Sequence, residues 1–214
     1  MFSWDLLSGA IVFGLLLGCF YAAVSIGLSV SFGLLDVPHI AHPALLVAGA
    51  YGTWWLAGMG LDPIVAGLVL APPFFLIGVA LYRIYYATFE KRGSDAALRG
   101  LAFFFGVAFI IEVGLILAAG VDQRLVEASY IGSSIDLTED LRVPLRLIVA
   151  FAVALLLTIC LTLYLGKTFM GRAIKAVAQD QVALSLMGAD PVRVKQWAFG
   201  IATAVTAVAG ALLI

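Results

Sequence analysis

One tripeptide in this 214-residue sequence has the residue types of a nucleotide-binding site. Gly166-Lys167-Thr168 matches the end of a phosphate-binding loop, in which successive backbone N–H groups wrap the phosphates. Such a loop needs another glycine five positions before Gly166, but that residue is Leu161, and a long apolar run rather than a strand precedes the tripeptide. We therefore expect Lys167 to be a basic residue at the cytoplasmic end of a membrane helix, with no nucleotide bound.

Two histidines at helical spacing, His39 and His42, lie next to two prolines, Pro38 and Pro43. Imidazole nitrogens are common zinc ligands, but a zinc site needs further ligands, and none lies nearby in the sequence. A break in a membrane helix is the other interpretation, and broken helices in transporters line solute pathways or interfaces. We expect the histidines to have one of these roles, without a bound metal.

Other polar side chains fall within apolar runs. Glu112 is in the middle of one run, and a carboxylate inside a membrane is costly enough to indicate either a function or a paired position facing other helices. Tyr21 and Ser25, spaced i, i+4, present hydroxyl groups on one helix face, which fits local packing or a pathway lining. With His39 and His42, these residues are the candidate substrate pathway. The sequence shows no catalytic constellation, so neither catalytic residues nor a cofactor are expected.

Membrane helices must position these side chains. The sequence is 64% hydrophobic and 12% charged, whereas soluble domains are about half apolar and a quarter charged. Its apolar runs suit the roughly 20 residues that cross a bilayer as a helix, and the alternating strands of a membrane barrel are absent. We predict an all-α, polytopic membrane protein with about six transmembrane spans in a single domain, residues 1–214. The predicted spans are 6–35, 43–60, 63–87, 100–120, 145–166 and 196–214.

Small residues spaced four apart predict where helices pack closely. Gly14 and Gly18 form a GxxxG pair. This pattern fits ordinary packing within the chain and also fits a dimer face. Two looser pairs occur near the C-terminus, Gly200 with Ala204 and Ala207 with Ala211.

Charged residues between the apolar runs predict the orientation. Segments 83–99 and 166–195 are mainly basic, whereas 121–144 is acidic. Basic loops stay in the cytoplasm, so 121–144 and the N-terminus are predicted to lie outside. This orientation depends on the number of spans before the first basic loop, and a re-entrant segment at 36–43 would change that number. The basic residues are Arg83, Lys91, Arg92, Arg99, Lys167, Arg172, Lys175, Arg193 and Lys195, with Glu90, Asp95, Asp180 and Asp190 among them; the acidic residues are Asp122, Glu127, Asp136, Glu139 and Asp140.

The polar segment 166–195 has the pattern of a short amphipathic helix. Residues 171–187 are good helix formers, with apolar side chains at helical spacing and a polar opposite face. Gly188 is placed to end this helix, and Asp190 with Pro191 begins a new one that returns to the membrane. The polar face mixes both charge signs, so a partner protein fits it better than a lipid surface, which favours a mostly basic face.

Three stretches resemble a known family. Residues 171–213, from GRAIKAVAQDQ to VAGALL, resemble the cytoplasmic coupling region of LivH-type permease subunits from the branched-chain amino acid family of ABC importers. Residues 14–51 resemble the N-terminal region of proteins in the same family. Residues 92–112 resemble the connection between the third and fourth spans of these proteins. One departure widens the choice of substrate: residues 39–43 read His-Ile-Ala-His-Pro, where the family usually has Asn-Phe-Ala-His-Gly.

The resemblance implies a permease of the type II ABC importer fold, located in the bacterial inner membrane. Its amphipathic coupling helix, about residues 171–188, would dock on a separate subunit that hydrolyses ATP. The implied partners are ABC ATPase subunits, a second permease subunit, a periplasmic substrate-binding protein and membrane lipid, with no nucleic acid. The residues expected to contact the ATPase are Ala178, Gln179, Asp180, Leu186, Met187 and Gly188.

The resemblance leaves the substrate open. Permeases of this appearance carry branched-chain or other amino acids, urea or short amides. An ion-coupled secondary transporter is a further alternative, which a single intramembrane carboxylate supports poorly. Family members continue for several spans past the position of Ile214, so the chain is expected to be a C-terminally shortened permease or a fragment.

Overall fold

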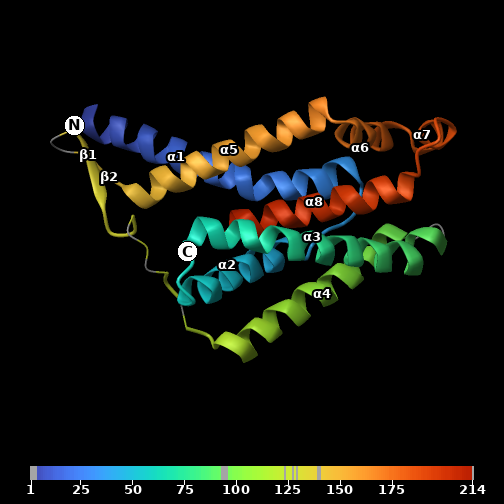
Figure 1. The fold of residues 1–214 in the computed structure, drawn as a ribbon, viewed down its shortest axis with the longest axis horizontal. Coiled ribbons are helices and arrows are strands. Elements are labelled where there is room, and N and C mark those ends of the chain that lie inside the picture. The colour runs from blue at the N-terminus through green and yellow to red at the C-terminus, as the bar shows by residue number, and fades with distance from the viewer. Residues whose placement is uncertain are drawn as a thin grey trace.

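The protein is a bundle of long helices with one short β-hairpin at one end (Figure 1). The computed structural model describes residues 4–92, 96–122, 124–126, 128, 130–138 and 141–213. The α-helices of this part of the chain are α1 (Trp4–Leu28), α2 (His42–Gly58), α3 (Pro63–Thr88), α4 (Ala96–Ala119), α5 (Leu145–Lys167), α6 (Phe169–Gln179), α7 (Gln181–Leu186) and α8 (Pro191–Ala211). A π-helical turn η1 (Ser29–Leu34), a 3-10 turn η2 (Glu90–Arg92) and strands β1 (Ser134–Thr138) and β2 (Leu141–Pro144) complete the elements.

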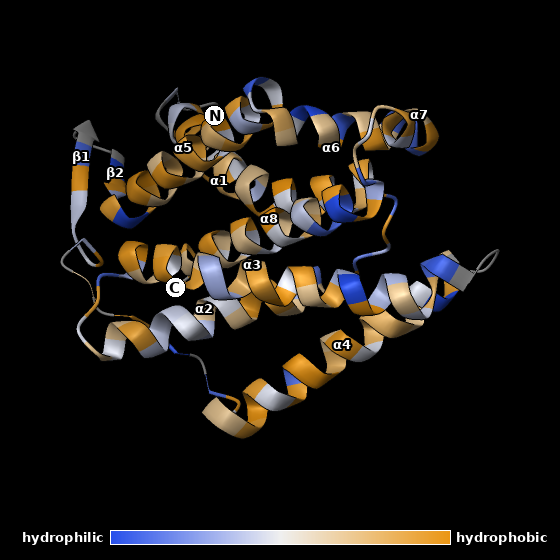
Figure 2. Cartoon of the chain, turned by 45° about the vertical axis from the view of Figure 1, so that its right-hand side comes forward, coloured by the Kyte–Doolittle hydropathy of each residue, from blue (hydrophilic) through white to orange (hydrophobic). Residues whose placement is uncertain are grey.

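The predicted helical membrane fold is confirmed. Within the described residues, four helical stretches are long and apolar enough to cross a membrane: Leu6–Leu34, Pro63–Thr88, Ala97–Ala119 and Leu145–Lys167. The other two predicted spans correspond to α2, of 17 residues, and α8, of 21 residues. Figure 2 shows apolar residues along all the long helices. Helix α8 lies in the middle of the bundle, where α1, α2 and α3 pack against it (Figure 1).

Glycines opposite α8 allow this close packing. A Cβ atom added at Gly49 of α2 would lie 2.9 Å from the Cα atom of Ala207, and one added at Gly78 of α3 would lie 2.5 Å from Oγ1 of Thr203. The predicted pair of Gly14 and Gly18 is different, because no described atom beyond the glycine's own turns of α1 lies within 4 Å of either Cβ position. Helix packing within the chain therefore uses glycines that face α8, and the GxxxG pair takes no part in it.

The connection between α1 and α2 returns into the bundle instead of covering its end. Leu35, Val37, His39 and Ala41 are each 2% exposed or less. The reversal occurs at Asp36, whose φ of 53° is left-handed, a conformation that aspartate tolerates better than most residues. Helix α2 consequently begins inside the bundle and runs back to the hairpin end (Figure 1). The connector of residues 35–41, which we call the re-entrant connector, therefore leaves unchanged the number of crossings on which the predicted orientation depends.

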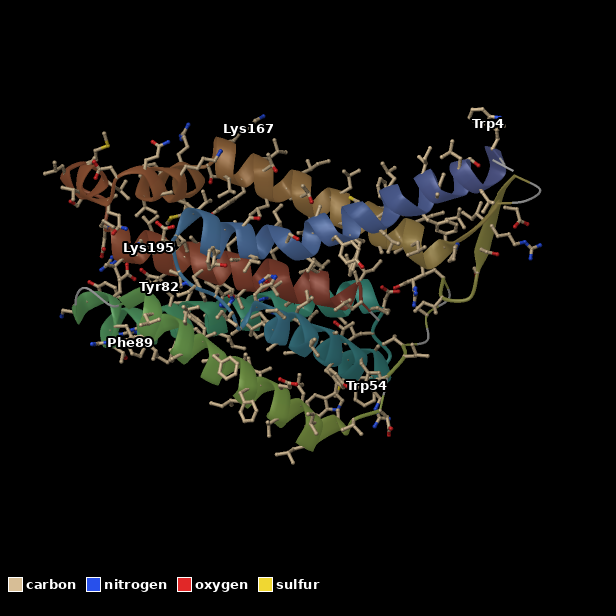
Figure 3. All side chains as sticks on the ribbon, turned by 180° about the vertical axis from the view of Figure 1, so that it is seen from behind. Trp4, Trp54, Tyr82, Phe89, Lys167 and Lys195 are labelled. Atoms are coloured by element: carbon tan, nitrogen blue, oxygen red, sulfur yellow. The ribbon has the colours of Figure 1, made fainter. Side chains whose placement is uncertain are left out.

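The charged segments divide between the two ends of the bundle. Turn η2 and helices α6 and α7 lie at one end, while the hairpin and the start of α1 lie at the other (Figure 1). Figure 3 shows the same division, with Lys167 and Lys195 at one end and Trp4 and Trp54 at the other. This grouping agrees with the charge pattern of the sequence. Four residues used in that pattern, Asp95, Glu127, Glu139 and Asp140, lie outside the described residues.

The hairpin was not among the predicted elements. Strands β1 and β2 pair in antiparallel fashion within the acidic segment 121–144. Across the hairpin, Nε of Arg142 lies 2.9 Å from Oδ1 of Asp136, and both side chains are exposed. Nearby, burial and the Asp62 carboxylate raise the pKa of Tyr130, so its hydroxyl group stays neutral at ordinary pH.

Candidate functional site

The predicted single helix of residues 171–188 is two helices that meet at Asp180, so this prediction was wrong. Asp180 is extended, with φ −154° and ψ 108°, and its N–H donates to the carbonyl of Ala176 at 3.0 Å. Its Oδ1 accepts hydrogen bonds from the N–H groups of Val182 at 2.8 Å and Ala183 at 3.0 Å. Asp180 therefore ends α6 and caps α7. A capping carboxylate competes with helix propensity, and at Asp180 the cap prevails over the propensity of the surrounding residues.

The tripeptide Gly166-Lys167-Thr168 forms the corner between α5 and α6. Lys167 is the exposed last residue of α5, and Oγ1 of Thr168 caps α6 by accepting a hydrogen bond from the N–H of Gly171 at 3.0 Å. A Cβ atom at Gly171 would lie 2.5 Å from the Cα atom of Leu165. The absence of a side chain there lets α6 fold closely against the end of α5. This geometry agrees with the prediction that the tripeptide is a helix end.

One face of α6 and α7 is anchored in the bundle. Ile174, Val177 and Leu184 are at most 6% exposed and belong to the main hydrophobic core. After α7 the chain turns at Gly188, whose φ is +82°. Oδ1 of Asp190 then caps α8 by accepting from a backbone N–H at 2.9 Å, with proline at the first helical position. The predicted glycine stop and Asp-Pro start are confirmed.

The opposite face of α7 leaves large apolar side chains uncovered. Val182, Leu186 and Met187 are 69%, 84% and 83% exposed. We call these three residues the α7 apolar patch. Val182 was not among the residues predicted to contact the ATPase. Its apolar side chain close to the capping Asp180 could have indicated that role. The six residues expected to contact an ATPase are all exposed: Ala178, Gln179, Asp180, Leu186, Met187 and Gly188.

A buried ion pair joins the start of α8 to the turn after α3. Nζ of Lys195 lies 2.7 Å from Oε1 of Glu90, and the Lys195 side chain is only 6% exposed. Oε2 of Glu90 accepts a hydrogen bond from the Tyr82 hydroxyl at 2.8 Å, and the Tyr82 ring contacts Phe199 of α8. Figure 3 shows Lys195 and Tyr82 close together at the η2 end. From the sequence, Lys195 is one of several basic loop residues, and its pairing could not be predicted because its partner is 105 positions away.

The two candidate histidines lie in and beside the re-entrant connector. Nε2 of His42 is 2.9 Å from the carbonyl oxygen of Val24, and its Nδ1 is 3.2 Å from Oγ1 of Thr206, so His42 links α1, α2 and α8. The His39 ring packs on Phe104 and Phe199, with centroids 5.1 and 4.5 Å away. Neither nitrogen of His39 has a hydrogen-bond partner among the described residues. That part of the chain also contains no group of three His, Cys, Asp or Glu residues that could hold a metal ion.

The remaining pathway candidates do not lie together. Glu112 faces a groove of about 380 Å³ between α2 and α4, which Tyr51 also lines. Glu112 precedes Ala119, the last residue of α4, by seven positions, so it lies in the half of the helix that is nearer the hairpin end. Tyr21 and Ser25 are exposed on α1, which does not line this groove. His39 and His42 do not line this groove, although Ile40 and Pro43 next to them do, and the two hydroxyl groups lie on another helix.

The capping role of Asp180 can be separated from its charge. Asp180→Asn keeps a side-chain oxygen that can accept from the backbone and should preserve α7, whereas Asp180→Ala should lower the local stability of α7 by about 1 kcal/mol. Hydrogen exchange of the Val182 and Ala183 amides measures this difference. Equal amide protection in the two variants would contradict the capping role.

Comparisons with known proteins identify the family. The model of a family described as "Branched-chain amino acid transport system / permease component" matches residues 10–214. One relative is the high-affinity branched-chain amino acid transport system permease protein BraD of Pseudomonas aeruginosa, to which the chain is 24% identical over 212 residues. This match covers 95% of the present chain and 69% of BraD.

Two further relatives are the permease proteins LivH of Salmonella typhimurium and of Escherichia coli K12. They are 27% identical over 217 residues and 25% identical over 212 residues, and each match covers 94% of this chain and 68% of the relative. No solved structure matches the chain. The chain therefore belongs to the family of branched-chain amino acid transport permeases, multi-pass membrane components of ABC transporters that are transport subunits and not enzymes.

Proposed function

We propose that the chain is the permease subunit of an ATP-driven importer for branched-chain or other amino acids, and that α6 and α7 couple it to a separate ATPase subunit. The α7 apolar patch carries this proposal, because it is uncovered on a helix whose other face belongs to the core. Exposed apolar side chains rimmed by polar residues indicate a protein contact, and a helix seated in a groove is a recurrent form of such contacts.

The proposed orientation follows from the charges. The end with η2, α6 and α7 is cytoplasmic, since its segments are mainly basic. The hairpin and the N-terminus then face the periplasm, where a substrate-binding protein delivers the solute. A second permease subunit completes the membrane part of the transporter, and ATP hydrolysis takes place on the ATPase.

Two connections would carry motion from the ATPase to the transport helices. Helix α6 follows α5 directly through the Thr168 corner, and α7 leads through Gly188 into α8. The ion pair between Lys195 and Glu90 also ties α8 to the end of α3. A displacement of α7 therefore acts on α5, α8 and α3 together. This subunit supplies the membrane pathway and responds to the closure of its partner.

We expect the double variant Leu186→Glu with Met187→Glu to lose the ATPase subunit. Both side chains are more than 80% exposed, so the charges should leave the fold intact while preventing burial against a partner. The measurement is purification from native membranes in mild detergent, with bound subunits identified, followed by ATP-dependent amino acid uptake in proteoliposomes. Uptake should fall to background.

The matched control is Val121→Glu, which places the same charge on a side chain 82% exposed at the hairpin end. It should retain the ATPase. An ATPase that stays bound to the double variant, with the patch instead contacting lipid, would contradict the proposal. Uptake driven by a proton or sodium gradient would favour a secondary transporter, and ATP-driven uptake restricted to urea or short amides would reassign the substrate.

A further inference from the structure

A furrow runs along one side of α2, from the hairpin end toward the re-entrant connector. Its inner part, of about 380 Å³, lies between α2 and α4 and reaches Ile40 and Pro43. Its outer part, of about 470 Å³, shares Val47 and Tyr51 with the inner part and extends to Arg124. The two parts adjoin at Val47 and Tyr51, which line both of them. Cavities of this size accommodate small organic solutes.

The inner part presents one carboxylate on α4, a mostly apolar helix whose other charged residue is Arg99 near its start. Among the described residues that line it, Glu112 alone is acidic. Glu112 is exposed, and the described chain offers it no hydrogen-bond or ion-pair partner. A charge on a membrane helix is strongly unfavourable unless it faces water, protein or a ligand. A furrow that receives a cationic group accounts for its position.

The outer part of the furrow contains a positive charge, Arg124, whose position is fixed by two contacts. Nη2 of Arg124 donates a hydrogen bond to the carbonyl of Ala119 at 2.8 Å, and the guanidinium lies 5.1 Å from the ring centroid of Trp54. Since Ala119 follows Glu112 by seven residues on α4, the two charges are separated by about 10 Å along the helix axis. A compact solute entering from the hairpin end meets the cation first and the carboxylate second.

We propose that this furrow is a binding site for a zwitterionic amino acid with an aliphatic side chain. Arg124 receives the carboxylate of the solute at the mouth, and Glu112 then binds its ammonium group in the inner part. Val47, Leu115 and Ile116 provide apolar walls for the aliphatic side chain. The inference rests on the proposed transport function and adds to it the chemical class of the solute. A neutral solute such as urea has no charged groups to pair with Arg124 and Glu112.

The test is ligand binding to the complete transporter complex in nanodiscs, without the substrate-binding protein, so that only the membrane site contributes. The probes are leucine, leucinamide, which lacks the carboxylate, and 4-methylpentanoate, which lacks the ammonium group. In Glu112→Gln, affinity for leucine and leucinamide should fall roughly 10- to 100-fold, the effect of losing a charge-assisted hydrogen bond. Affinity for 4-methylpentanoate should remain unchanged.

Arg124→Gln should give the complementary pattern, with weaker binding of leucine and 4-methylpentanoate and unchanged binding of leucinamide. Glu112→Asp keeps a carboxylate and should retain the preference for probes with an ammonium group. Leu117→Ala is the matched control, because Leu117 is 82% exposed on α4 and does not line the furrow. It should leave all three affinities unchanged.

The outcomes separate this site from the transport function. An equal loss of affinity for all three probes in Glu112→Gln would show that Glu112 has a structural role and would overturn the proposed site. A native complex that binds none of the probes would also overturn it. ATP-driven uptake is measured on the same complexes. Native uptake together with an unchanged binding pattern in Glu112→Gln would overturn the site and leave the transport function standing, whereas a native complex without ATP-driven uptake would overturn the transport function itself.

Discussion

Lys195→Met is expected to lower the free energy of unfolding by about 3–5 kcal/mol, because it leaves the Glu90 carboxylate poorly solvated and without its counter-charge. The side chains of Lys195 and Glu90 are 6% and 23% exposed, and the charged atoms are 2.7 Å apart. Glu90→Gln should have a similar effect, since it leaves the Lys195 ammonium buried. Unfolding of the purified protein in detergent, followed by circular dichroism, measures both changes.

The double variant Lys195→Met with Glu90→Gln should recover most of this loss, because neither charge then remains unpaired. Tyr82→Phe removes one hydrogen bond to the Glu90 carboxylate and should cost less, about 1.5–3 kcal/mol. Arg193→Met is the matched control, as the Arg193 side chain is 81% exposed and its pairing with Asp190 is a surface contact. Additive losses in the double variant would show that the two charges do not interact.

Gly49→Ala and Gly78→Ala are each expected to lower the free energy of unfolding by about 1–3 kcal/mol, because the added methyl groups overpack the contacts with α8. At Gly49 the methyl group would lie 2.9 Å from the Ala207 backbone, and at Gly78 it would lie 2.5 Å from Oγ1 of Thr203. Helix backbones cannot move apart here without opening the centre of the bundle. Thermal unfolding in detergent measures the change.

Gly14→Ala and Gly18→Ala provide the internal control, since no described atom beyond the neighbouring turns of α1 lies within 4 Å of either added methyl group. They should leave stability unchanged or raise it by up to about 1 kcal/mol through helix propensity. Equal losses at Gly14 and Gly49 would contradict the packing argument. Loss of a subunit contact in crosslinking, with the fold intact, would assign the GxxxG pair to a dimer face, the alternative that the sequence left open.

The coupling segment shows which local features are predictable. Gly188, Asp190 and Pro191 end or begin helices through their own backbone preferences, and the structure agrees at all three positions. The break at Asp180 has an equally local cause, but its outcome depended on a competition between a side-chain cap and the helix propensity of the surrounding residues. The apolar spacing of residues 171–187 alone did not decide that competition, and it predicted one helix where there are two.

The candidate site was less predictable because it depends on which helix faces meet. The sequence placed Glu112 in a membrane helix, but only packing shows that it opens onto a furrow with Tyr51 and, farther out, Arg124. It grouped Tyr21 and Ser25 with the histidines, and these hydroxyl groups lie on α1, outside that furrow. Periodicity identifies the faces of a single helix, and it contains no information about the neighbouring helix.

By itself, the sequence determined that this protein is a helical membrane protein, which charged segments share an end, and, through its resemblance, the family. The conclusions about the membrane fold and the charged ends depend on the length of apolar runs and on local charge. Each segment interacts with the bilayer through these properties, largely independently of the others. Only the tertiary structure decided that Lys195 meets Glu90, that His42 joins Val24 and Thr206, and that α2 begins inside the bundle. These contacts join residues far apart in the chain, and they depend on the packing of helix faces, in which Gly49 of α2 and Gly78 of α3 let these helices approach α8 closely.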